Sequence, residues 1–323
     1  MTKYTYDLAT GEIDPKAALD YFLKQRDPEA DKFDNGKVLV IAGSRGMTGA
    51  AILCARGAMH SGAGLVYSAL PAECLRSVEQ VLLEAVKCPV GGPGKFYFDE
   101  ADEERLIELS AGMDSVVIGP GLGRAPGTIG LVRKLLGNAE FAKDAKALII
   151  DADGLYPYSG DTEALKKAAA LRPGKFVITP HEGEASRLLS ICREHIRAAR
   201  EKYALELASL LFGGTAVLKG HRTVVAAGDE LNVNVTGNSG MGTGGSGDVL
   251  AGIIAGMAAG SNIAKCSGKA EERGKDCQPL KNIVKFAVAV HGMAGDVMAE
   301  KHSQRFITAS DIITGLGELT EYA

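Results

Sequence analysis

Residues 238–260 read N-S-G-M-G-T-G-G-S-G-D-V-L-A-G-I-I-A-G-M-A-A-G, and the rest of the chain can be interpreted around them. The first half is almost all glycine, serine and threonine, so its backbone can adopt positive φ and approach a ligand closely. The second half, 249–259, is small and apolar, which is typical of a helix packed tightly on a sheet. A glycine turn leading into a helix directs unpaired N–H groups and the positive end of the helix dipole at one point. The stretch therefore predicts an anion site at the start of a buried helix.

Asp248 is the first charged residue of this predicted helix, and it follows Gly245-Ser246-Gly247. Its presence has a purely structural explanation, because Asp often caps the free N–H groups at a helix start. Capping does not explain the preceding glycines, however, since each of them costs backbone entropy when it is ordered. We therefore favour Asp248 as a base that takes a proton from a hydroxyl group attacking phosphorus beside the anion site.

The composition is that of a globular protein. The chain has 323 residues, 46% of them hydrophobic, and a formal net charge of −4. Its length allows one large α/β domain or two small ones, and its slightly acidic balance argues against nucleic acid as a partner. The longest apolar run, 249–260, is shorter than the ~20 residues of a membrane span, and residues 1–11 lack a signal-peptide core. We therefore expect a cytoplasmic protein with neither nucleic acid nor membrane as a partner.

The cysteines and histidines give no sign of a metal centre. Six cysteines are scattered without C-x-x-C spacing, so neither a zinc site nor a disulfide framework is predicted. Two of them, Cys266 and Cys277, fall in the charge-rich stretch 265–279, which we expect to be a surface loop. His60, His195, His221, His291 and His302 show no metal-ligand spacing either.

Short apolar runs alternate with helical patterns along the chain. Strands are expected at 37–42, 65–69, 115–118, 147–150, 175–178 and 215–218, with a hairpin of 223–227 and 231–236 around Gly228-Asp229. Helices are expected at 16–26, 49–60, 102–110, 128–136, 162–171, 192–211 and 282–299, with a last short helix opened by Thr308-x-x-Asp311. The alternation predicts an α/β fold with a central, mostly parallel sheet and helices on both faces. No stretch is a convincing linker, so we expect a single domain at 37–323, preceded by an N-terminal helix and connector at 1–36.

Each polar or glycine-rich motif comes directly after a predicted strand, and ligands of parallel sheets bind at the carboxyl ends of the strands. The motifs lie at 43–48, 119–124, 151–153, 179–184 and 219–220. We therefore expect them to converge on one edge of the sheet. The chain contains no G-x-x-x-x-G-K-[ST] sequence, so a P-loop is not predicted.

The segment Thr179-Pro180-His181-Glu182 predicts a helix capped by Thr179, with proline at the first helical position. It places His181 and Glu184 about one helical turn apart. Glu184 could hold Mg²⁺ through water, and a solvated carboxylate on a helix is an equally good interpretation. The acids at 151 and 153 could bind a ligand or shape a turn, and the lysine at 219 could neutralise a phosphate.

Taken in order, these motifs resemble those of the ADP/ATP-dependent NAD(P)H-hydrate dehydratases, a branch of the ribokinase-like superfamily. The matching stretches are V-L-V-I-A-G-S at 38–44, T-G-A-A at 48–51, H-S-G-A-G-L-V at 60–66, G-P-G-L-G-R at 119–124, D-A-D-G-L at 151–155, T-P-H-E-G-E at 179–184, L-K-G at 218–220 and G-G-S-G-D-V-L-A-G at 244–252. The resemblance implies a ribokinase-like fold and a lyase that restores hydrated NADH or NADPH. The ring hydroxyl would be phosphorylated by ADP or ATP, and phosphate would then be eliminated.

The resemblance also implies site residues. Asp248 would be the catalytic base, and the anion hole would consist of Gly245, Ser246 and Gly247. The substrate pocket would include Ala63, Gly123, His181 and Asp248. Contacts to the nucleotide would come from Lys219, Gly220, His221, Arg222, Thr223 and Gly247. Mg²⁺ would be the cofactor, held through water by Glu184, and the partners would be hydrated NAD(P)H, an adenine nucleotide and further copies of the chain.

Two other functions remain open at this stage. A kinase for a small alcohol, such as a thiazole or pyrimidine vitamin precursor, would use the same anion hole and base but release a stable phosphate ester. A nucleotide-binding regulator without turnover is the second, and Asp248 argues against it because a sensor needs no base.

Overall fold

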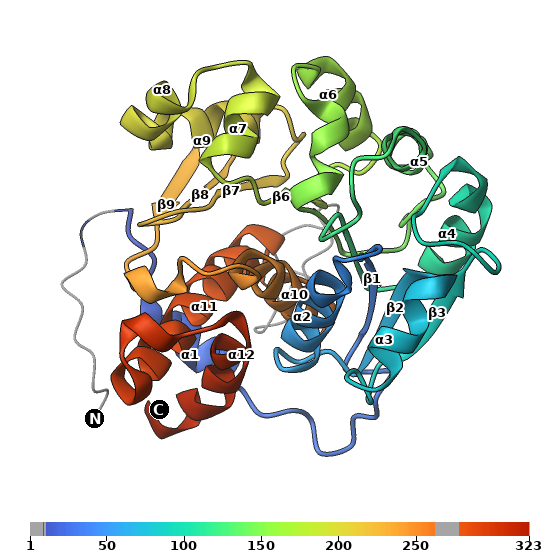
Figure 1. The fold of residues 1–323 in the computed structure, drawn as a ribbon. Helices are drawn as coiled ribbons and strands as arrows, with labels where there is room; N and C mark the ends of the chain where they lie inside the picture. Colours follow the sequence, from blue (N-terminus) through green and yellow to red (C-terminus); the bar gives the residue numbers. More distant parts are fainter. Residues whose placement is uncertain (1–8, 10, 262–277, 323) are drawn as a thin grey trace.

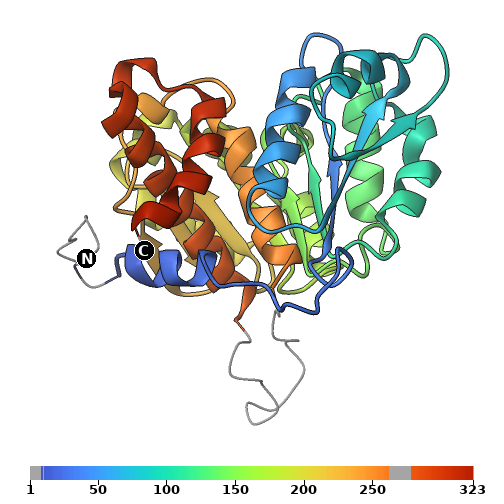
Figure 2. The ribbon, with the colours of Figure 1, turned by 90° about the horizontal axis from the view of Figure 1, so that it is seen from below.

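A computed structural model describes residue 9, residues 11–261 and residues 278–322. These residues form one sheet between two layers of helices (Figures 1 and 2). The predicted surface loop at 265–279, with Cys266 and Cys277, lies outside the described residues except for its last two positions.

Within the described residues the sheet has nine strands: β1 (Lys37–Ile41), β2 (Leu65–Pro71), β3 (Val86–Val90), β4 (Ser115–Ile118), β5 (Ala147–Ile150), β6 (Phe176–Ile178), β7 (Thr215–Leu218), β8 (Val224–Ala227) and β9 (Glu230–Val233). Their order is β3-β2-β1-β4-β5-β6-β7-β8-β9. Neighbouring strands from β3 to β7 are parallel, and Val38 of β1 lies opposite Val66 and Ser115. The strand β8 pairs antiparallel with both β7 and β9, and its pairing with β9 is the predicted hairpin. The predicted mostly parallel sheet is confirmed.

Helices cover both faces of the sheet, and each face has its own core. One face carries α1 (Pro15–Phe22), α2 (Thr48–Met59), α3 (Leu75–Glu79), α10 (Ser246–Ala259), α11 (Leu280–His302) and α12 (Ala309–Glu318). The other carries α4 (Glu103–Ser110), α5 (Pro126–Gly137), α6 (Thr162–Ala170), α7 (Glu182–Leu189), α8 (Arg193–Ala198) and α9 (Arg200–Ser209). Successive side chains of a strand point to opposite faces, so Val38 and Val40 enter the first core and Leu39 and Ile41 the second.

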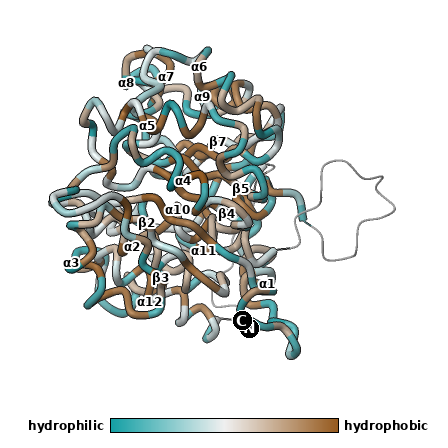
Figure 3. Tube along the Cα trace, turned by 90° about the vertical axis from the view of Figure 1, so that its right-hand side faces the viewer, coloured by the Kyte–Doolittle hydropathy of each residue, from teal (hydrophilic) through white to brown (hydrophobic). Residues whose placement is uncertain are grey.

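The helix α10 lies at the centre of its layer, where it packs against α2, α11, β4 and β5. All of its residues from Val249 to Ala259 are buried, and its tube is coloured as hydrophobic in Figure 3, as is expected of a helix segment without a solvent face. A methyl group added to Gly252 would collide with the backbone of Cys54, so α2 and α10 approach closely. This packing fixes the first turn of α10 at the carboxyl edge of the sheet. No helix in the described part of the chain is long and apolar enough to cross a membrane.

Three local predictions are corrected. The strand β3 was not predicted, because Lys87 and Pro89 break its apolar pattern; an edge strand tolerates both. The helix predicted at 192–211 is two helices, since the backbone at Ala199 leaves helical geometry (φ −141°, ψ 51°). The helix α7 is capped by His181 instead of Thr179, because the Thr179 hydroxyl is engaged by a buried carboxylate described below.

Candidate active site

The first turn of α10 forms an open set of hydrogen-bond donors. Gly245 is the N-cap residue with φ +91°, and a side chain there would collide with Leu53. In the described part of the chain, the N–H groups of Gly245, Gly247 and Asp248 have no hydrogen-bond partner, whereas that of Ser246 points to Thr243 O at 3.4 Å. The positive end of the helix dipole lies behind these donors. This arrangement can receive a phosphate or another developing anion.

A buried ionic cluster faces this turn. Asp151 follows β5 and is only 1% exposed. Its Oδ1 accepts hydrogen bonds from the Thr179 hydroxyl at 2.7 Å and from Lys219 Nζ at 2.5 Å. A methyl group on Gly247 would lie 3.1 Å from Lys219 Nζ, so the ammonium group stands beside the donors of α10. Lys219 Nζ also lies 3.9 Å from Glu184 Oε2. Residues of the motifs at 151–153, 179–184 and 219–220 therefore meet in this cluster.

Burial raises the pKa values of two acids in this cluster. It raises the pKa of Asp248 to about 7, with a further contribution from the negative charge of Asp151 and an opposing one from Lys219. Burial and Asp151 also raise the pKa of Glu184, against the effect of Lys219. Burial opposes the charge of Lys219, but Asp151 and Glu184 raise its pKa overall. A carboxylate with a pKa near 7 is well suited to take up a proton at neutral pH.

His181 and Glu184 form a reciprocal cap at the start of α7. His181 Nδ1 accepts a hydrogen bond from Gly183 N at 2.9 Å, and Glu184 Oε2 accepts one from His181 N at 2.8 Å. Burial and the nearby Lys219 lower the pKa of His181 to about 4, so its imidazole is neutral with the proton on Nε2. Nε2 lies 3.4 Å from Glu184 Oε1. The predicted proximity of the two side chains is therefore confirmed.

Gly123 lies on the β4 side of the same edge. Its N–H donates to Asp153 Oδ2 at 2.9 Å, and Arg124 Nε donates to Asp153 Oδ1 at 2.8 Å, so this acid shapes the turn. The φ of Gly123 is +81°, and a methyl group there would face Met47 and Tyr97. These two side chains are 37% and 43% exposed, which leaves an open, partly apolar wall beside Gly123.

The loop 219–223 follows β7. Thr223 Oγ1 donates to Gly220 O at 3.0 Å and so closes the turn. Arg222 has φ +54° and its guanidinium pairs with Glu12, away from the cluster, while His221 is exposed. Lys219 is thus the member of this loop whose side chain reaches Asp151.

Ala63 is not brought to the other predicted residues. It directly precedes Gly64, whose N–H donates to Gly36 O at 3.0 Å at the amino edge of the sheet. The C-terminal end of α10 lies beside it, because a side chain on Gly256 would collide with Ser61. The 14 residues of α10 span about 20 Å at ~1.5 Å per residue. Ala63 therefore lies about one helix length from Asp248.

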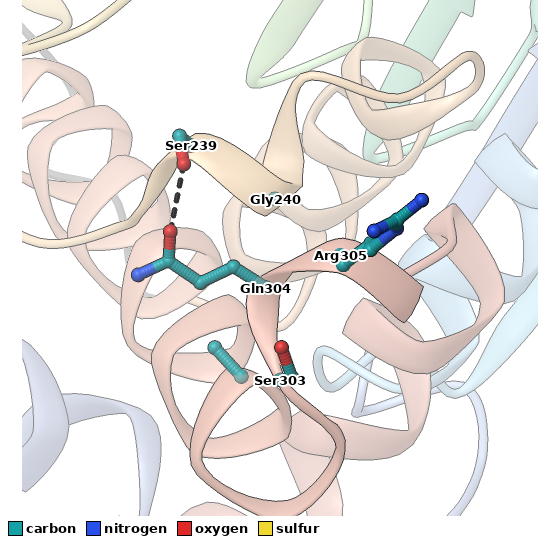
Figure 4. Close-up of a pocket in the computed structure, with 6 residues that line it drawn as sticks. Ser239, Gly240, Ser303, Gln304 and Arg305 are labelled. Atoms are coloured by element: carbon teal, nitrogen blue, oxygen red, sulfur yellow. Dashed lines mark hydrogen bonds between the residues drawn. The ribbon is translucent and has the colours of Figure 1, made fainter.

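A cavity of about 700 Å³ adjoins the segment that leads into the anion hole. Its walls come from that segment, from the end of α11 and from the turn that follows α11 (Figure 4): Ser239, Gly240, Ala299, Ser303, Gln304 and Arg305. The Ser239 hydroxyl donates to Gln304 Oε1 at 2.7 Å across it. In the described part of the chain, no group of three or more His, Cys, Asp or Glu side chains could enclose a metal ion.

The model of the NAD(P)H-hydrate dehydratase family matches residues 38–316. The chain belongs to this family. It is 36% identical over 303 residues to the bifunctional NAD(P)H-hydrate repair enzyme Nnr of Moorella thermoacetica, covering 90% of this chain and 50% of that protein. It is 34% identical over 240 residues to the ADP-dependent (S)-NAD(P)H-hydrate dehydratase of Neisseria meningitidis serogroup B, covering 74% of each. The chain thus spans about half the length of the bifunctional relatives it matches.

Solved structures agree with this family membership. The ADP/ATP-dependent NAD(P)H-hydrate dehydratase from Bacillus subtilis, co-crystallized with ATP/Mg²⁺, has a TM-score of 0.75 and 26% identity, covering 97% of this chain and 98% of that one. Ribokinase from Giardia lamblia has a TM-score of 0.51 at 14% identity, covering 88% and 99%, and shares the fold. The chain therefore has the predicted ribokinase-like fold.

Sequence reasoning missed two contributions to this dehydratase-family site. Thr179 was assigned to a helix cap, although its hydroxyl binds the buried Asp151. His291 was given no role, although it lies against Ser246 beneath the anion hole. The signal for Thr179 was a polar residue directly after a buried strand, and for His291 a histidine within the apolar middle of a helix.

Proposed function

We propose that this chain catalyses the ADP- or ATP-dependent dehydration of hydrated NADH or NADPH. One observation carries the proposal: a carboxylate with a pKa raised to about 7, Asp248, lies in the first turn of a helix with unpartnered N–H donors. A base and an anion site in this arrangement suit transfer of a phosphoryl group to a hydroxyl. Membership of the NAD(P)H-hydrate dehydratase family supplies the substrate class.

In the proposed first step, Asp248 takes the proton of the ring hydroxyl as its oxygen attacks the terminal phosphorus of the nucleotide. The bond from phosphorus to the bridging oxygen breaks, and N–H groups at the start of α10 stabilise the transferred group. In the second step the lone pair of the ring nitrogen expels phosphate from the adjacent carbon. Loss of a proton from the next carbon then restores the double bond. Phosphorylation assists the reaction because phosphate is a far better leaving group than hydroxide.

Asp151 and Glu184 are the residues that would hold Mg²⁺, mainly through water. Asp151 Oδ2 is a buried carboxylate oxygen without a hydrogen-bond partner in the described part of the chain, as a site for a hard cation requires. Bound Mg²⁺ would supply neutralisation of charge on the phosphates. The residues of the chain would meanwhile orient the nucleotide through Lys219 and the loop that ends at Thr223.

The proposed substrate side contains Gly123, His181 and Asp248, and the proposed nucleotide side contains Gly247 and residues 219–223. Ala63 is left out of the site because it lies at the opposite edge of the sheet.

We also propose that 37–323 form the catalytic domain, with 1–36 as an N-terminal helix and connector. A cytoplasmic location fits the free thiols of Cys54, Cys74, Cys88 and Cys192. We further propose that the protein assembles into a homo-oligomer.

The test is to incubate the protein with hydrated NADH, Mg²⁺ and either ADP or ATP. The return of NADH absorbance and the release of phosphate are then followed together. We expect one phosphate per NADH restored, and Asp248→Asn should lower the rate about 10²–10⁴-fold while nucleotide still binds. A variant with more than about a tenth of the wild-type rate would contradict the role of Asp248. Absence of NADH recovery, with a stable phosphate ester formed from a small alcohol, would favour the kinase.

A further inference from the structure

His291 is a buried histidine that the proposed mechanism does not use. It belongs to α11 and is 9% exposed. Its Nε2 lies 3.0 Å from Ser246 O and 3.3 Å from Ser246 Oγ, directly beneath the first turn of α10. The carbonyl oxygen can only accept a hydrogen bond, so Nε2 must carry the proton and donate it. Burial lowers the pKa of His291 to about 4, and the ring is therefore a neutral donor at physiological pH.

The carbonyl of Ser246 and the N–H of Gly247 belong to the same planar peptide unit. A hydrogen bond to the carbonyl oxygen polarises that unit, which strengthens the N–H on its other side as a donor. The Gly247 N–H has no partner in the described part of the chain, and Lys219 Nζ stands beside it. The contact from His291 thus acts on one of the groups available to bind the anion.

The same helix also fixes the segment that precedes the anion hole. Thr236 Oγ1 donates to Ala289 O at 2.8 Å, two residues before His291. Asp296 accepts from Gly237 N at 2.8 Å and from Asn238 Nδ2 at 2.9 Å. Both ends of the glycine-rich segment are therefore held by α11, and His291 makes the contact nearest the reacting group.

We propose that His291 is a positioning residue of the anion hole, which orients and polarises the Ser246–Gly247 peptide so that its N–H points at the transferred phosphoryl group. The reaction named here rests on the proposed function, whereas the geometry applies to any phosphoryl transfer at this site. The role differs from simple core packing, because it should affect the transition state more than the bound ground state.

Two variants separate these roles. His291→Leu fills similar space without a donor, and His291→Gln keeps an N–H donor near the position of Nε2. We expect His291→Leu to lower kcat at least about tenfold with the nucleotide KM changed less than about twofold. His291→Gln should recover most of that loss. Removal of a whole oxyanion donor costs about 10²–10³-fold, so the loss of one polarising contact should be smaller.

Binding of the product nucleotide (AMP where ADP is the donor, ADP where ATP is the donor), alone and together with aluminium fluoride as a mimic of the transferred phosphoryl group, gives a readout independent of turnover. His291→Leu should weaken binding of the product nucleotide with aluminium fluoride about as much as it lowers kcat, and leave binding of the product nucleotide alone unchanged. Equal weakening of both ligands, unchanged kcat, or equal losses in His291→Gln and His291→Leu would each overturn the proposal. If His291→Leu does not fold, His291→Asn, with a side chain too short for the same contact, takes its place. Wild-type protein that binds the mimic but dehydrates no hydrated NADH would contradict the proposed function and leave this inference testable.

Discussion

Asp248 and Lys219 differ in how burial affects them, although they lie in one cluster. Burial removes Asp248 from water and raises its pKa to about 7, because no cation is bonded to it directly. Lys219 is also removed from water, but it contacts Asp151 at 2.5 Å and keeps its charge. The first residue is thus prepared to exchange a proton and the second to hold a permanent positive charge.

The pKa of Asp248 predicts the pH dependence of the reaction. A base acts in its deprotonated form, so kcat/KM should rise about tenfold per pH unit below pH 7 and level off above it. Initial rates measured from about pH 5 to pH 9 check this. Asp248→Asn is the control, and its kcat/KM should not show the rise below pH 7. A flat wild-type profile down to about pH 5 would exclude Asp248 as the base.

The same pKa predicts a cost in stability. A folded-state pKa raised above 3.8 means that the folded protein binds a proton which the unfolded chain has released between about pH 4 and pH 7. The cost in unfolding free energy is therefore absent below about pH 4, grows as the pH rises, and reaches its full size above pH 7. Asp248→Asn should therefore melt at a higher temperature than wild type at pH 8, and at the same temperature at pH 4. An equal difference at both pH values would show that another cause dominates.

The pair of Lys219 and Asp151 predicts a coupled effect. Lys219→Met leaves the Asp151 carboxylate buried without its ammonium partner, which should cost about 3 kcal/mol of unfolding free energy. The double variant Lys219→Met/Asp151→Asn removes both charges and should recover most of this stability, but not activity. Urea unfolding of the single and double variants measures the coupling. Additive losses in the double variant would show that the two charges do not stabilise each other.

At the scale of the secondary-structure element, the start of α10 has two kinds of glycine. Gly245 is required by the backbone, because its φ is +91° and Leu53 occupies the space of a side chain. Gly247 lies in the helical first turn, and its missing side chain leaves room between the N–H donors and Lys219 Nζ. The first glycine builds the turn, and the second keeps the anion hole open.

This distinction predicts the effect of side chains at neighbouring positions. Gly247→Val should lower kcat roughly 100-fold by entering the anion hole, with the melting temperature lowered by less than about 4 °C. Gly244→Val is the matched control, since an added methyl group there has no atom within 4 Å and no positive φ is required. Similar kinetics for the two variants would show that the glycine at 247 has no function in catalysis.

At the scale of the whole molecule, the parallel strands bring distant loops to one edge. The turn containing Gly123 follows β4, the cluster follows β5 to β7, and α10 begins beside Lys219 of that cluster. A ligand that spans this edge can contact the anion hole and the wall of Met47 and Tyr97 at once. A dinucleotide is several times longer than a small alcohol, so these two classes of substrate should differ in their contacts to this wall.

We therefore predict that the products NADH or NADPH bind and compete with substrate. Gly123→Val and Tyr97→Ala should weaken dinucleotide binding about tenfold and change binding of ADP or ATP much less. Phe212→Ala is the matched control, because this exposed aromatic side chain precedes β7 at the amino edge. Calorimetric titration of each ligand measures these effects. Undetectable dinucleotide binding at about millimolar concentration, or equal effects on both ligands, would favour the small-alcohol kinase.

Much of this architecture could be predicted because it is encoded locally. The glycines before Asp248 and the apolar residues after it predicted the open helix start, and short apolar runs predicted the parallel strands. Motifs placed after strands had to converge on the carboxyl edge, since the strands are parallel. Features with a short period or a special backbone requirement need no knowledge of distant residues.

Other features depend on pairs of residues far apart in the chain. Asp151 and Lys219 are separated by 68 positions, and Ser246 and His291 by 45, so no local sequence pattern predicts either contact. Competition for Thr179 by Asp151 moved the helix cap to His181, and the length of α10 carried Ala63 away from the site. The pKa of Asp248 likewise follows from burial, which exists only in the folded chain. The sequence alone therefore determined the class of fold and the position of the anion hole. Tertiary packing decided which charges meet around it, because burial and long-range pairing are properties of the assembled layers.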